Sequence, residues 1–566
     1  MKSNSSSIKY EDKPWLKSYI PGVPEKMTYE QLCIPEFLER SAKNFPKTMA
    51  LNFMGFTMNF RELDDMVNRF AAALTGFGIK KGDSVACILP NIIPCVAAYY
   101  GILRIGAIAV MNNPLYSDKE LEHQLKDSES KVLITLDLLA NRMIDLRPKT
   151  GVKQIIVTSI GNYLPFPKSL LFPLVAKKKK LAADVKKAAD VYFWKDVIKS
   201  SKPTSQRVSL TFDDVAQYQY TGGTTGVSKG VILTHGNLSK NVQQMASWFP
   251  KMEKGKEVML GALPFFHVFG LTASMNYAIH ESWGNVLVPK PQPDPLFETF
   301  KKFKPSFVPM VPTMYIGLLS HPKIDTLDLS FVTGCFSGSA PLAVEVIKKF
   351  EEKTGALICE GFGMTESSPV THVNPFAKGK PKPGSIGIPI PDTECRIVSI
   401  EDLKTDVPAG KSGEMIMRGP QVMKAYKGMP EETKNTLRDG WLHTGDIAQM
   451  DEDGYFYIVD RLKDMVISGG YNVYPREIDE VLYTHPKVQE ACSIGIPHGT
   501  RGEAVKIFVV LKAGETATEK EILDFCKDKL ATYKLPQEIE FRTDLPKSAV
   551  GKVLRKELRA EELKKR

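Results

Sequence analysis

The chain has 566 residues, and at roughly 100–200 residues per domain this length excludes a single small binding module. Apolar residues make up 43% and charged residues 25%, a composition typical of a soluble globular protein rather than of a disordered, collagenous or membrane-embedded one. The formal net charge of +10 is too small over this length to indicate nucleic acid as the main partner. We therefore expect a multidomain protein that does not bind nucleic acid.

Between residues 30 and 160, helical patterns alternate with short apolar runs. ELDDMVNRFAAALTGFG (62–78) ends in a glycine typical of a helix stop, and the strand-like SVACIL (84–89) follows it. The stretches 96–113 and 120–136 repeat this order, and we expect VKQIIVTS (152–159) and VLVPK (286–290) to extend the same sheet. Repeated helix–strand units predict an α/β fold of layered subdomains with a mostly parallel sheet.

The prolines, Asn91 and Arg104 interrupt the most apolar stretch, residues 87–111, and the first residues lack the apolar core of a signal peptide. We expect no membrane-spanning helix.

The eight cysteines include no Cys-x-x-Cys pair, and a chain of this length does not depend on disulfides. The sequence therefore predicts a reducing compartment, the cytoplasm.

After residue 460 the elements become smaller. MVISGGYNVYP (465–475) reads as one strand, REIDEVLYTH (476–485) as a helix, and ACSIGIP (491–497) and AVKIFVVLK (504–512) as strands. EKEILDFCKDKL (519–530) and the basic tail read as further helices. We predict a large N-terminal domain (1–459), a short charged hinge (460–464) and a small mobile α+β C-terminal domain (465–566).

Residues 163–190 join an apolar, proline-punctuated stretch to a lysine cluster, with seven lysines against two aspartates. Two interpretations remain open. The segment is either a solvated surface insertion or a peripheral contact with anionic lipid on the inner face of a membrane, because basic residues beside apolar ones favour such a surface.

The segment YTGGTTGVSKG (220–230) has four glycines, three threonines, one serine and one lysine. Such a loop brings backbone N–H groups and hydroxyls close to phosphate oxygens, and its lysine supplies a counter-charge. The segment lacks Walker A spacing. Gly226 to Gly230 also fits Gly-x-Ser-x-Gly, but the nucleophile elbow of serine hydrolases needs a strand before the serine and a helix after it, and here the strand-like VILTH follows.

Six further motifs follow in order: LPFFHVFG (263–270), GSAPL (338–342), EGFGMTES (360–367), GWLHTGD (440–446), DRLKDMVISGGYNVYPREIDEVL (460–482) and PKSAVGK (546–552). With the loop at 220–230, they resemble the signatures of the adenylate-forming superfamily, which includes acyl-CoA synthetases, firefly-luciferase-like enzymes and peptide-synthetase adenylation domains. The resemblance covers nearly the whole chain from about residue 30. It is strongest to bacterial long-chain fatty-acid–CoA ligases.

This resemblance implies a ligase that activates a medium- to long-chain fatty acid with ATP, through an acyl-AMP intermediate, and transfers the acyl group to coenzyme A. A carboxylate and ATP are both anions, so catalysis needs charge neutralisation and alignment. Mg²⁺ is expected with ATP, and Glu366 is a suitable oxygen ligand, together with Thr225. Lys552 is expected to reach the carboxylate and the α-phosphate, and His267 to gate the acyl and thiol tunnels.

The other expected contacts fall into three groups. An ionised aspartate such as Asp446 accepts two hydroxyl donors and suits a ribose diol. With it, the expected ATP and AMP contacts are Thr221, Gly222, Gly223, Thr224, Thr225, Gly226, Lys229, Gly338, Ser339, Ala340, Glu360, Gly361, Phe362, Gly363, Thr365, Arg461 and Lys463. Those for coenzyme A are Ser468, Gly469 and Gly470, and the expected acyl pocket is lined by Phe266, Gly270, Gly334 and Phe336.

Lys463 stands where the family places its hinge, which is often an aspartate, so this chain departs from the commoner residue. The expected acyl lining has no basic side chain for a second charge on the substrate, which favours a plain hydrocarbon chain. Two other hypotheses stay open: an adenylating enzyme for an aromatic acid or for delivery to a carrier protein, and a nucleotide-binding regulator without turnover. The sequence leaves open whether the protein is a monomer or a homodimer.

Overall fold

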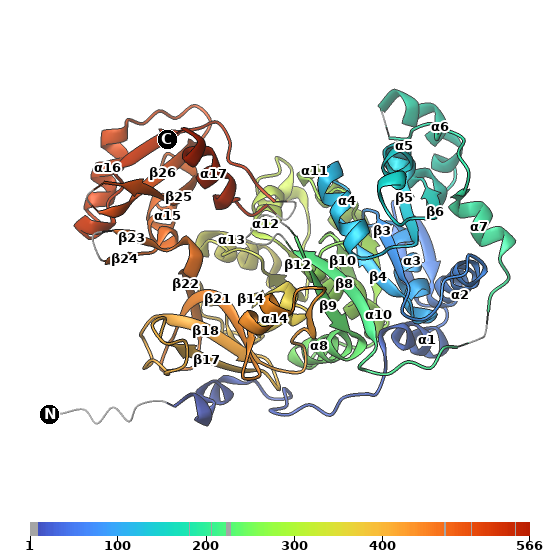
Figure 1. Ribbon diagram of the computed structural model, residues 1–566, viewed down its shortest axis with the longest axis horizontal. Helices are drawn as coiled ribbons and strands as arrows, with labels where there is room; N and C mark the ends of the chain where they lie inside the picture. The colour runs from blue at the N-terminus through green and yellow to red at the C-terminus, as the bar shows by residue number, and fades with distance from the viewer. Residues whose placement is uncertain are drawn as a thin grey trace. The chain divides into compact units, whose positions relative to one another are not determined.

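The computed structural model describes residues 9–179, 181–204, 207–221, 228–468, 471–499, 501–548 and 551–565. Contacts between Cα atoms divide the chain into two compact units (Figure 1). The larger unit comprises Ser18–Thr393 and Arg418–Asn435, and the smaller unit comprises Met1–Lys17, Glu394–Met417 and Thr436–Arg566. Each unit has its own sheets.

An eight-stranded sheet in the larger unit has the order β19-β9-β8-β4-β3-β5-β6-β7. The pairs among β3 to β8 are parallel, whereas β9 runs antiparallel to β8 and β19 antiparallel to β9. The strands are β3 (Ser84–Ile88), β4 (Ile108–Met111), β5 (Val132–Leu136), β6 (Gln154–Thr158), β7 (Val191–Phe193), β8 (Val215–Thr221), β9 (Lys229–Thr234) and β19 (Ala425–Tyr426). The helices between them are α2 (Phe60–Gly76), α3 (Ile93–Arg104), α4 (Asp118–Asp127), α5 (Asp137–Leu146), α6 (Lys168–Lys179), α7 (Trp194–Ser200) and α8 (His235–Trp248).

A nine-stranded sheet in the same unit has the order β16-β15-β14-β13-β12-β10-β11-β1-β2. Its strands are β1 (Met49–Phe53), β2 (Phe56–Asn59), β10 (Val258–Gly261), β11 (Gly284–Leu287), β12 (Phe307–Met310), β13 (Gly334–Ser337), β14 (Ile358–Gly363), β15 (Val370–Val373) and β16 (Ile388–Pro389). Its helices are α1 (Ile34–Asn44), α9 (Val268–Gly270), a π-helical turn η5 (Leu271–Asn276), α10 (Tyr277–His280), α11 (Pro293–Phe303), α12 (Pro312–Leu319) and α13 (Val344–Thr354). The π-helical turn directly follows the LPFFHVFG motif.

Local sequence sets several of these helix starts. Asn59, Ser117 and Thr234 cap α2, α4 and α8, and each side chain accepts a hydrogen bond from a backbone N–H three residues on. The side chain at that third position in turn accepts a hydrogen bond from the backbone N–H of the cap residue, forming a capping box. These reciprocal bonds satisfy backbone groups that a helix start otherwise leaves open.

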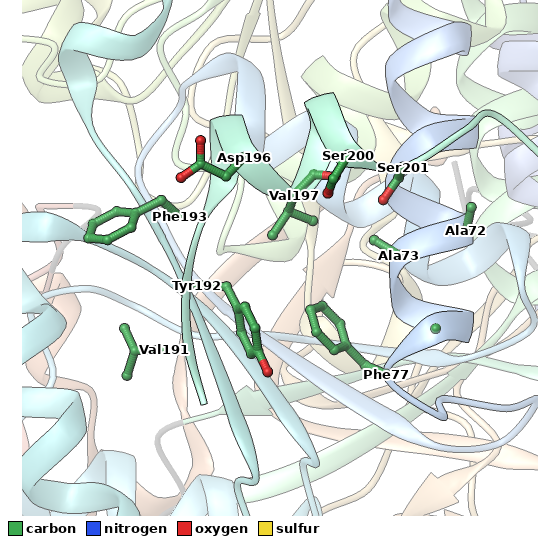
Figure 2. A pocket seen from close by; sticks show the side chains of 11 residues that line it. Ala72, Ala73, Phe77, Val191, Tyr192, Phe193, Asp196, Val197, Ser200 and Ser201 are labelled. Atoms are coloured by element: carbon green, nitrogen blue, oxygen red, sulfur yellow. The ribbon is translucent and has the colours of Figure 1, made fainter. Parts of the chain in front are cut away.

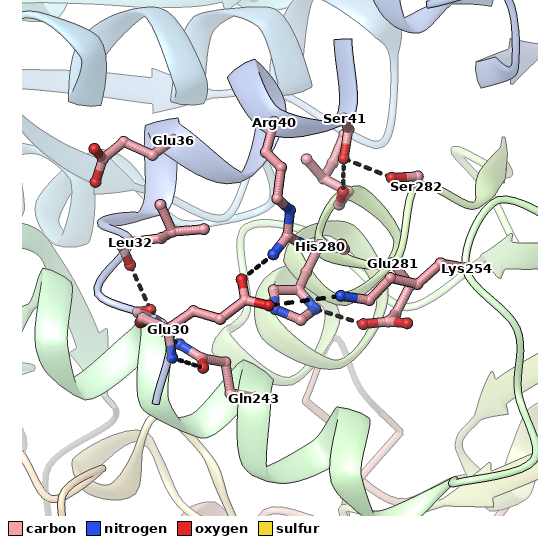
Figure 3. A network of polar contacts seen from close by, with 12 residues as sticks. Glu30, Leu32, Glu36, Arg40, Ser41, Gln243, Lys254, His280, Glu281 and Ser282 are labelled. Carbon is pink, nitrogen blue, oxygen red and sulfur yellow. Dashed lines mark hydrogen bonds and ion pairs between the residues drawn. The ribbon is translucent and has the colours of Figure 1, made fainter. Parts of the chain in front are cut away.

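A polar network holds α1 and the segment before it against α8 and α10 (Figure 3). Arg40 pairs with Glu30 and donates to the backbone carbonyl of His280. The Glu30 backbone N–H donates to Gln243 at 2.8 Å, and Ser41 Oγ donates to the carbonyl of Ile279 at 2.7 Å. The N-terminal helix is thus fastened by charge-assisted bonds as well as by its apolar face.

The smaller unit contains two five-stranded sheets. The first has β17 (Glu394–Val398), β18 (Gly413–Arg418), β20 (Leu437–Arg438), β21 (Trp441–Met450) and β22 (Phe456–Arg461). The second has β23 (Val466–Ser468), β24 (Tyr471–Val473), β25 (Val488–His498), β26 (Gly502–Leu511) and β27 (Glu538–Phe541), with α15 (Pro475–Tyr483), α16 (Glu519–Lys527) and α17 (Arg555–Lys565). The N-terminal segment joins this unit because Trp15 packs edge-on against Phe456, with ring centroids 6.0 Å apart.

The predicted α/β fold class is confirmed, and two details differ. VLVPK does not extend the first sheet, since β11 pairs with β1 and β10 in the nine-stranded sheet. MVISGGYNVYP is not one strand, because β23 and β24 pair antiparallel. By their contacts, Glu394–Met417 and the chain from Thr436 onward belong to the same unit as the C-terminal elements. The hinge at 460–464 stays a prediction. No helix in the described part of the chain is long and apolar enough to span a bilayer.

Candidate active site

The glycine- and threonine-rich segment connects two paired strands. Thr221 ends β8, Lys229 begins β9, and these two residues face each other in the antiparallel register. The strand after Ser228 excludes a nucleophile elbow, which needs a helix there. Gly222, Gly223, Thr224, Thr225 and Gly226 lie outside the described residues, so their predicted phosphate contacts stay predictions.

Lys229 and Glu366 both contact Tyr426, on the short strand β19. Lys229 is 9% exposed, its Nζ lies 2.5 Å from Glu432 Oε2, and it stands 5.0 Å from the centre of the Tyr426 ring. The Tyr426 hydroxyl donates to Glu366 Oε1 at 2.7 Å. Sequence reasoning missed Tyr426 and Glu432, because no motif marks the segment that supplies them.

Glu366 lies in the short turn Thr365–Ser367, directly after β14, and Thr365 is half-buried beside it. The backbone N–H of Met423 donates to the Glu366 carbonyl at 2.7 Å, which fixes the turn against the segment before β19. Across the described ranges, no group of three or more His, Cys, Asp and Glu side chains is arranged to hold a metal ion. A single carboxylate here suits Mg²⁺ that arrives with ATP rather than a protein-made metal cage.

The motifs GSAPL and EGFGMTES follow neighbouring parallel strands, in which Ser337 faces Glu360. Their carboxyl ends therefore meet at one edge of the sheet, the place where open α/β sheets bind ligands. Gly338 is buried, whereas Ser339 and Ala340 are exposed beyond it, and Ser339 has a positive φ of 72°. The structure thus brings the predicted adenine-binding segments together.

Protein packing also requires the glycines of this edge. A Cβ on Gly361 would lie 2.4 Å from the Phe336 ring, and one on Gly363 would lie 2.1 Å from the Pro369 carbonyl oxygen. A Cβ on Gly338 would lie 3.1 Å from the Phe269 ring. Glycine is needed at these positions because the neighbouring side chains and backbone leave little room for a Cβ. The sequence did not reveal this packing requirement.

Glu360 and Phe362 both make contacts within the protein. The Glu360 carboxylate is 7% exposed and accepts from the backbone N–H groups of Leu342 at 3.1 Å and Gly384 at 3.3 Å. It borders a cavity of about 200 Å³. Phe362 is half-buried and meets the His372 ring edge-on at 6.2 Å. The Glu360 carboxylate thus helps to hold the two loops beside it.

His267 caps the short helix α9, and its Nδ1 accepts from the Phe269 backbone N–H at 3.3 Å. Burial lowers the pKa of His267 to about 4, so the ring is neutral near pH 7 and carries its proton on Nε2. Phe266 is half-buried beside it, and the Gln219 side chain donates to the Phe266 carbonyl at 2.8 Å. The predicted role of His267 as a gate stays a prediction.

The residues expected to line the acyl pocket are mostly buried. Phe336 is 1% exposed and meets the Phe269 ring edge-on at 5.5 Å. A Cβ on Gly270 would lie 2.3 Å from the Pro264 carbonyl oxygen, and one on Gly334 would lie 2.9 Å from the Met252 methyl group. These contacts fill the space beside both glycines, and the acyl pocket stays a prediction.

A cavity of about 460 Å³ lies elsewhere in the larger unit, between α2, β7 and α7 (Figure 2). The Phe77 and Tyr192 rings, 4.8 Å apart, form one side of it, and Asp196 and Ser200 border it from α7. None of the predicted site residues lines this cavity.

In the smaller unit, Asp446 and Arg461 face each other on the paired strands β21 and β22. Arg461 Nε lies 2.6 Å from Asp446 Oδ1. Asp446 is 2% exposed, and its other oxygen, Oδ2, has no hydrogen-bond partner among the described residues. A buried carboxylate oxygen without a donor is costly, and a hydroxyl group of a ligand would satisfy it.

Lys552 belongs to the same cluster of charges. Loss of water around its ammonium, together with the positive charge of Arg461, lowers the pKa of Lys552 to about 8, and the charge of Asp446 partly opposes this shift. The residue as a whole is nevertheless exposed. The structure thus unites Lys552, Asp446 and Arg461, which lie far apart in sequence.

Lys463 is exposed on the turn Leu462–Asp464, and its backbone carbonyl accepts from Arg559 at 3.2 Å. Ser468 is 4% exposed at the end of β23, opposite Tyr471 and Gly502. Gly469 and Gly470 lie outside the described residues, and the predicted pantetheine passage stays a prediction.

Sequence reasoning also missed Arg555, the first residue of α17. It pairs with Asp479 on α15, donates to the Ser493 carbonyl at 3.2 Å, and lies 3.8 Å from Asp460. Arg555 therefore ties the segment after Lys552 to Asp460, the first residue of the predicted hinge. A single arginine in a basic C-terminal tail forms no sequence pattern that would predict this role.

Models of known protein families match both the N-terminal and the C-terminal part of the chain. The AMP-binding enzyme family matches residues 38–427, and the AMP-binding enzyme C-terminal domain matches residues 477–552. A long-chain-fatty-acid–CoA ligase of Bacillus subtilis is 46% identical over 97% of this chain and 98% of its own length. One from Escherichia coli is 39% identical over 97% of this chain and 98% of its own length.

Solved structures share the fold. The anthranilate CoA ligase AuaEII in complex with anthranoyl-AMP is 27% identical, with a TM-score of 0.82 over 99% of both chains. ATP-bound MatB from Rhodopseudomonas palustris is 28% identical, with a TM-score of 0.81 over 94% of this chain and 99% of that one. The family model, the full-length relatives and the shared fold lead to one conclusion: the chain belongs to the AMP-binding enzyme family.

Proposed function

We propose that this protein is an AMP-forming fatty-acid–CoA ligase. In the first half-reaction, a fatty-acid carboxylate oxygen attacks the α-phosphorus of ATP, forming acyl-AMP and releasing pyrophosphate. In the second, the thiolate of coenzyme A attacks the acyl carbon and releases AMP. The observation that carries the proposal is the 46% identity, over 97% of this chain, with the Bacillus subtilis long-chain-fatty-acid–CoA ligase.

The nucleotide is assigned to Asp446 and to the strand ends that carry GSAPL and EGFGMTES. The unpartnered Oδ2 of Asp446 would accept from a ribose hydroxyl, while Arg461, paired with Oδ1, keeps the carboxylate in place. Hydroxyl donors there remove the cost of a buried acceptor without a partner. The backbone after β13 and β14 would contact adenine, and Lys463 and the hinge would reorient the C-terminal elements between half-reactions.

Lys552 is assigned to the reacting groups. In its charged form, it would offset negative charge on the carboxylate and the α-phosphate as the new P–O bond forms. Glu366 and Thr225 are assigned to Mg²⁺, which would neutralise phosphate charge when bound with ATP. Tyr426 would hold the Glu366 carboxylate through its 2.7 Å hydrogen bond.

Ser468, Gly469 and Gly470 are assigned to the passage for coenzyme A, with His267 as the gate between the thiol and acyl paths. Phe266, Gly270, Gly334 and Phe336 are assigned to the acyl pocket. All eight cysteines are free and buried, which supports a reducing compartment, the cytoplasm, as the place of action.

The direct test is AMP release, dependent on coenzyme A, measured with straight-chain acids from acetate to stearate. We expect the highest kcat/KM with medium or long chains. Activity confined to aromatic acids would reject the fatty-acid assignment.

An aromatic-acid ligase is the second candidate, because anthranilate CoA ligase shares the fold at a TM-score of 0.82. ATP–pyrophosphate exchange with anthranilate, benzoate and palmitate separates the two, and offering a carrier protein in place of coenzyme A tests the acceptor.

A further inference from the structure

Lys229 and Glu432 form an ion pair in the segment expected to bind phosphate. Lys229 begins β9 within the glycine- and threonine-rich segment, and Glu432 lies on α14 (Pro430–Thr436). The Nζ and Oε2 atoms of the pair are 2.5 Å apart, although 203 positions separate the two residues in the chain. Among the described residues, each is the other's only ion-pair partner. The contact therefore joins a residue expected to contact ATP to one that no motif marks.

The two side chains differ in burial. The Lys229 side chain is 11% exposed, whereas the Glu432 side chain is 41% exposed. A buried ammonium that loses its anionic partner is costly, but a carboxylate near the surface recovers its water readily. Lys229 therefore needs a nearby anion at all times, and Glu432 can be replaced in that role at little cost.

Tyr426 places this pair beside the carboxylate assigned to Mg²⁺. Lys229 Nζ stands 5.0 Å from the centre of the Tyr426 ring, and the hydroxyl of the same ring donates to Glu366 Oε1 at 2.7 Å. The Tyr426 backbone N–H donates to Thr433 Oγ1 at 3.0 Å, so the residue next to Glu432 is held against the same strand. The side chains expected to contact ATP phosphate and Mg²⁺ therefore flank one ring, and α14 supplies the counter-charge.

A phosphate group bound at Lys229 would compete with Glu432. Both groups are anions, and placing both against one ammonium brings two negative charges close together, which their repulsion opposes. Hydrogen bonds from an ammonium to phosphate oxygens are charge-assisted, and ATP offers several such oxygens. An ion pair with one half-exposed partner, by contrast, shifts an equilibrium only a few-fold. The phosphate should therefore displace the carboxylate.

We propose that Glu432 is a positioning residue that exchanges places with a phosphate group of ATP as the partner of Lys229. Before ATP binds, Glu432 holds the Lys229 ammonium in the phosphate-binding segment. When ATP binds, a phosphate group takes over the ammonium and the Glu432 carboxylate turns to solvent. When pyrophosphate leaves, Glu432 recovers Lys229, which limits how tightly this product is held. The inference rests on the ligase function proposed above and concerns the nucleotide site of that function.

The test is the dissociation constant of ATP, measured by calorimetry with Mg²⁺ and without acid or coenzyme A. Glu432→Gln keeps the size of the side chain but removes the competing charge, so it should bind ATP about threefold more tightly than wild type, and pyrophosphate by a similar factor. Glu431→Gln is the matched control, because it removes the same charge from the neighbouring, exposed residue of α14, and it should bind both like wild type. Equal or weaker ATP binding by folded Glu432→Gln would overturn the exchange.

Thermal unfolding separates the exchange from a purely structural role. Without ATP, Glu432→Gln should unfold at a lower temperature than wild type, because Lys229 loses its partner. At saturating ATP the difference should disappear, because the tighter binding offsets the loss. A structural role would lower the unfolding temperature equally with and without ATP, and that result would reject the proposal.

A double-mutant cycle tests whether Glu432 acts through Lys229. In a Lys229→Gln background, Glu432→Gln should no longer tighten ATP binding, because no ammonium remains for the two anions to contest. An undiminished threefold gain in that background would show that Glu432 repels ATP directly, and it would contradict the exchange.

The same measurements distinguish this inference from the ligase function. Equal ATP and pyrophosphate affinities in wild type and Glu432→Gln, with AMP release dependent on coenzyme A retained, would reject the exchange and leave the ligase intact. Tighter ATP binding by Glu432→Gln without turnover of any acid would reject the ligase and support the exchange at an ATP site. A wild-type protein that does not bind ATP would reject both.

Discussion

Arg461 and Asp446 lie directly opposite each other on two antiparallel strands, with Nε 2.6 Å from Oδ1, and the second Asp446 oxygen is buried without a donor in the described part of the chain. A stable fold rarely keeps such an oxygen without a reason. A ligand hydroxyl would supply the missing donor, which is why the ribose of the proposed nucleotide is assigned to this carboxylate.

Replacing Asp446 with asparagine tests this assignment. The amide keeps the size of the side chain but removes the charge and one acceptor, so kcat/KM for ATP in ATP–pyrophosphate exchange should fall about a hundredfold, mainly through KM. Thermal unfolding serves as the control for folding. An unchanged KM for ATP in a folded variant would remove the ribose assignment.

The Lys552→Ala variant should separate the two half-reactions. Acyl-AMP formation should fall by on the order of a hundredfold or more, the scale of losing one preorganised donor, whereas thioester formation from supplied acyl-AMP should be spared. Lys564→Ala, which removes an exposed lysine on α17, is the matched control and should leave both half-reactions unchanged. Equal losses in both half-reactions would contradict the role given to Lys552.

The same lysine predicts a pH dependence. Loss of water around the ammonium and the charge of Arg461 lower the pKa of Lys552 to about 8. Only the charged form neutralises the reacting anions, so kcat/KM for adenylation should decline as pH rises through about 8. Lys552→Arg stays charged, and any activity that it retains should lack this decline. A basic limb that persists in the arginine variant would assign the titration to another group.

Arg555→Gln should destabilise the smaller unit by about 3 kcal/mol, because it leaves the buried Asp479 without its ionic partner. Burial, partly offset by Arg555, raises the pKa of Asp479 to about 6 from its ordinary value of 3.8. This group therefore stabilises the fold below pH 3.8, and its contribution is lost as pH rises through about 6.

Removing Arg555 should raise the pKa of Asp479 further and extend that loss to higher pH. Urea unfolding should then show a smaller deficit for the variant at about pH 5 than at about pH 8. Arg555→Lys should recover part of the stability. A deficit independent of pH would show that Asp479 is not the group affected.

Tyr426→Phe removes one hydroxyl and keeps the ring that Lys229 contacts. Glu366 then loses its 2.7 Å hydrogen bond, so the Mg²⁺ concentration needed for half-maximal ATP–pyrophosphate exchange should rise about fivefold. Glu366→Gln should raise it more. If Mg²⁺ dependence is unchanged in Tyr426→Phe while Glu366→Gln shifts it, the tyrosine does not position the carboxylate.

Much of the local structure could be predicted from the sequence. The helix from residue 60 and the strand at 84–88 follow from apolar periodicity and a glycine stop, which depend on neighbouring residues alone. The motif order was likewise sufficient to identify the family, because residue types that chemistry requires appear at readable spacings.

The tertiary structure decided which residues meet. Tyr426 and Glu366 are 60 positions apart, and Arg555 and Asp479 are 76 apart, yet each pair is in contact. No local pattern marks such pairs, because strand order and helix packing bring them together. For the same reason VLVPK contributes to the second sheet rather than the first.

The sequence by itself determined the helix and strand types, the family and the set of candidate residues, since these depend on side-chain chemistry and short-range periodicity. Only the tertiary structure decided that Asp446 keeps one oxygen without a partner among the described residues, beside Arg461 and Lys552, and that α6 exposes leucines to solvent. Whether a side chain is buried or exposed depends on the residues packed around it. The order of residues along the chain does not specify which residues those will be.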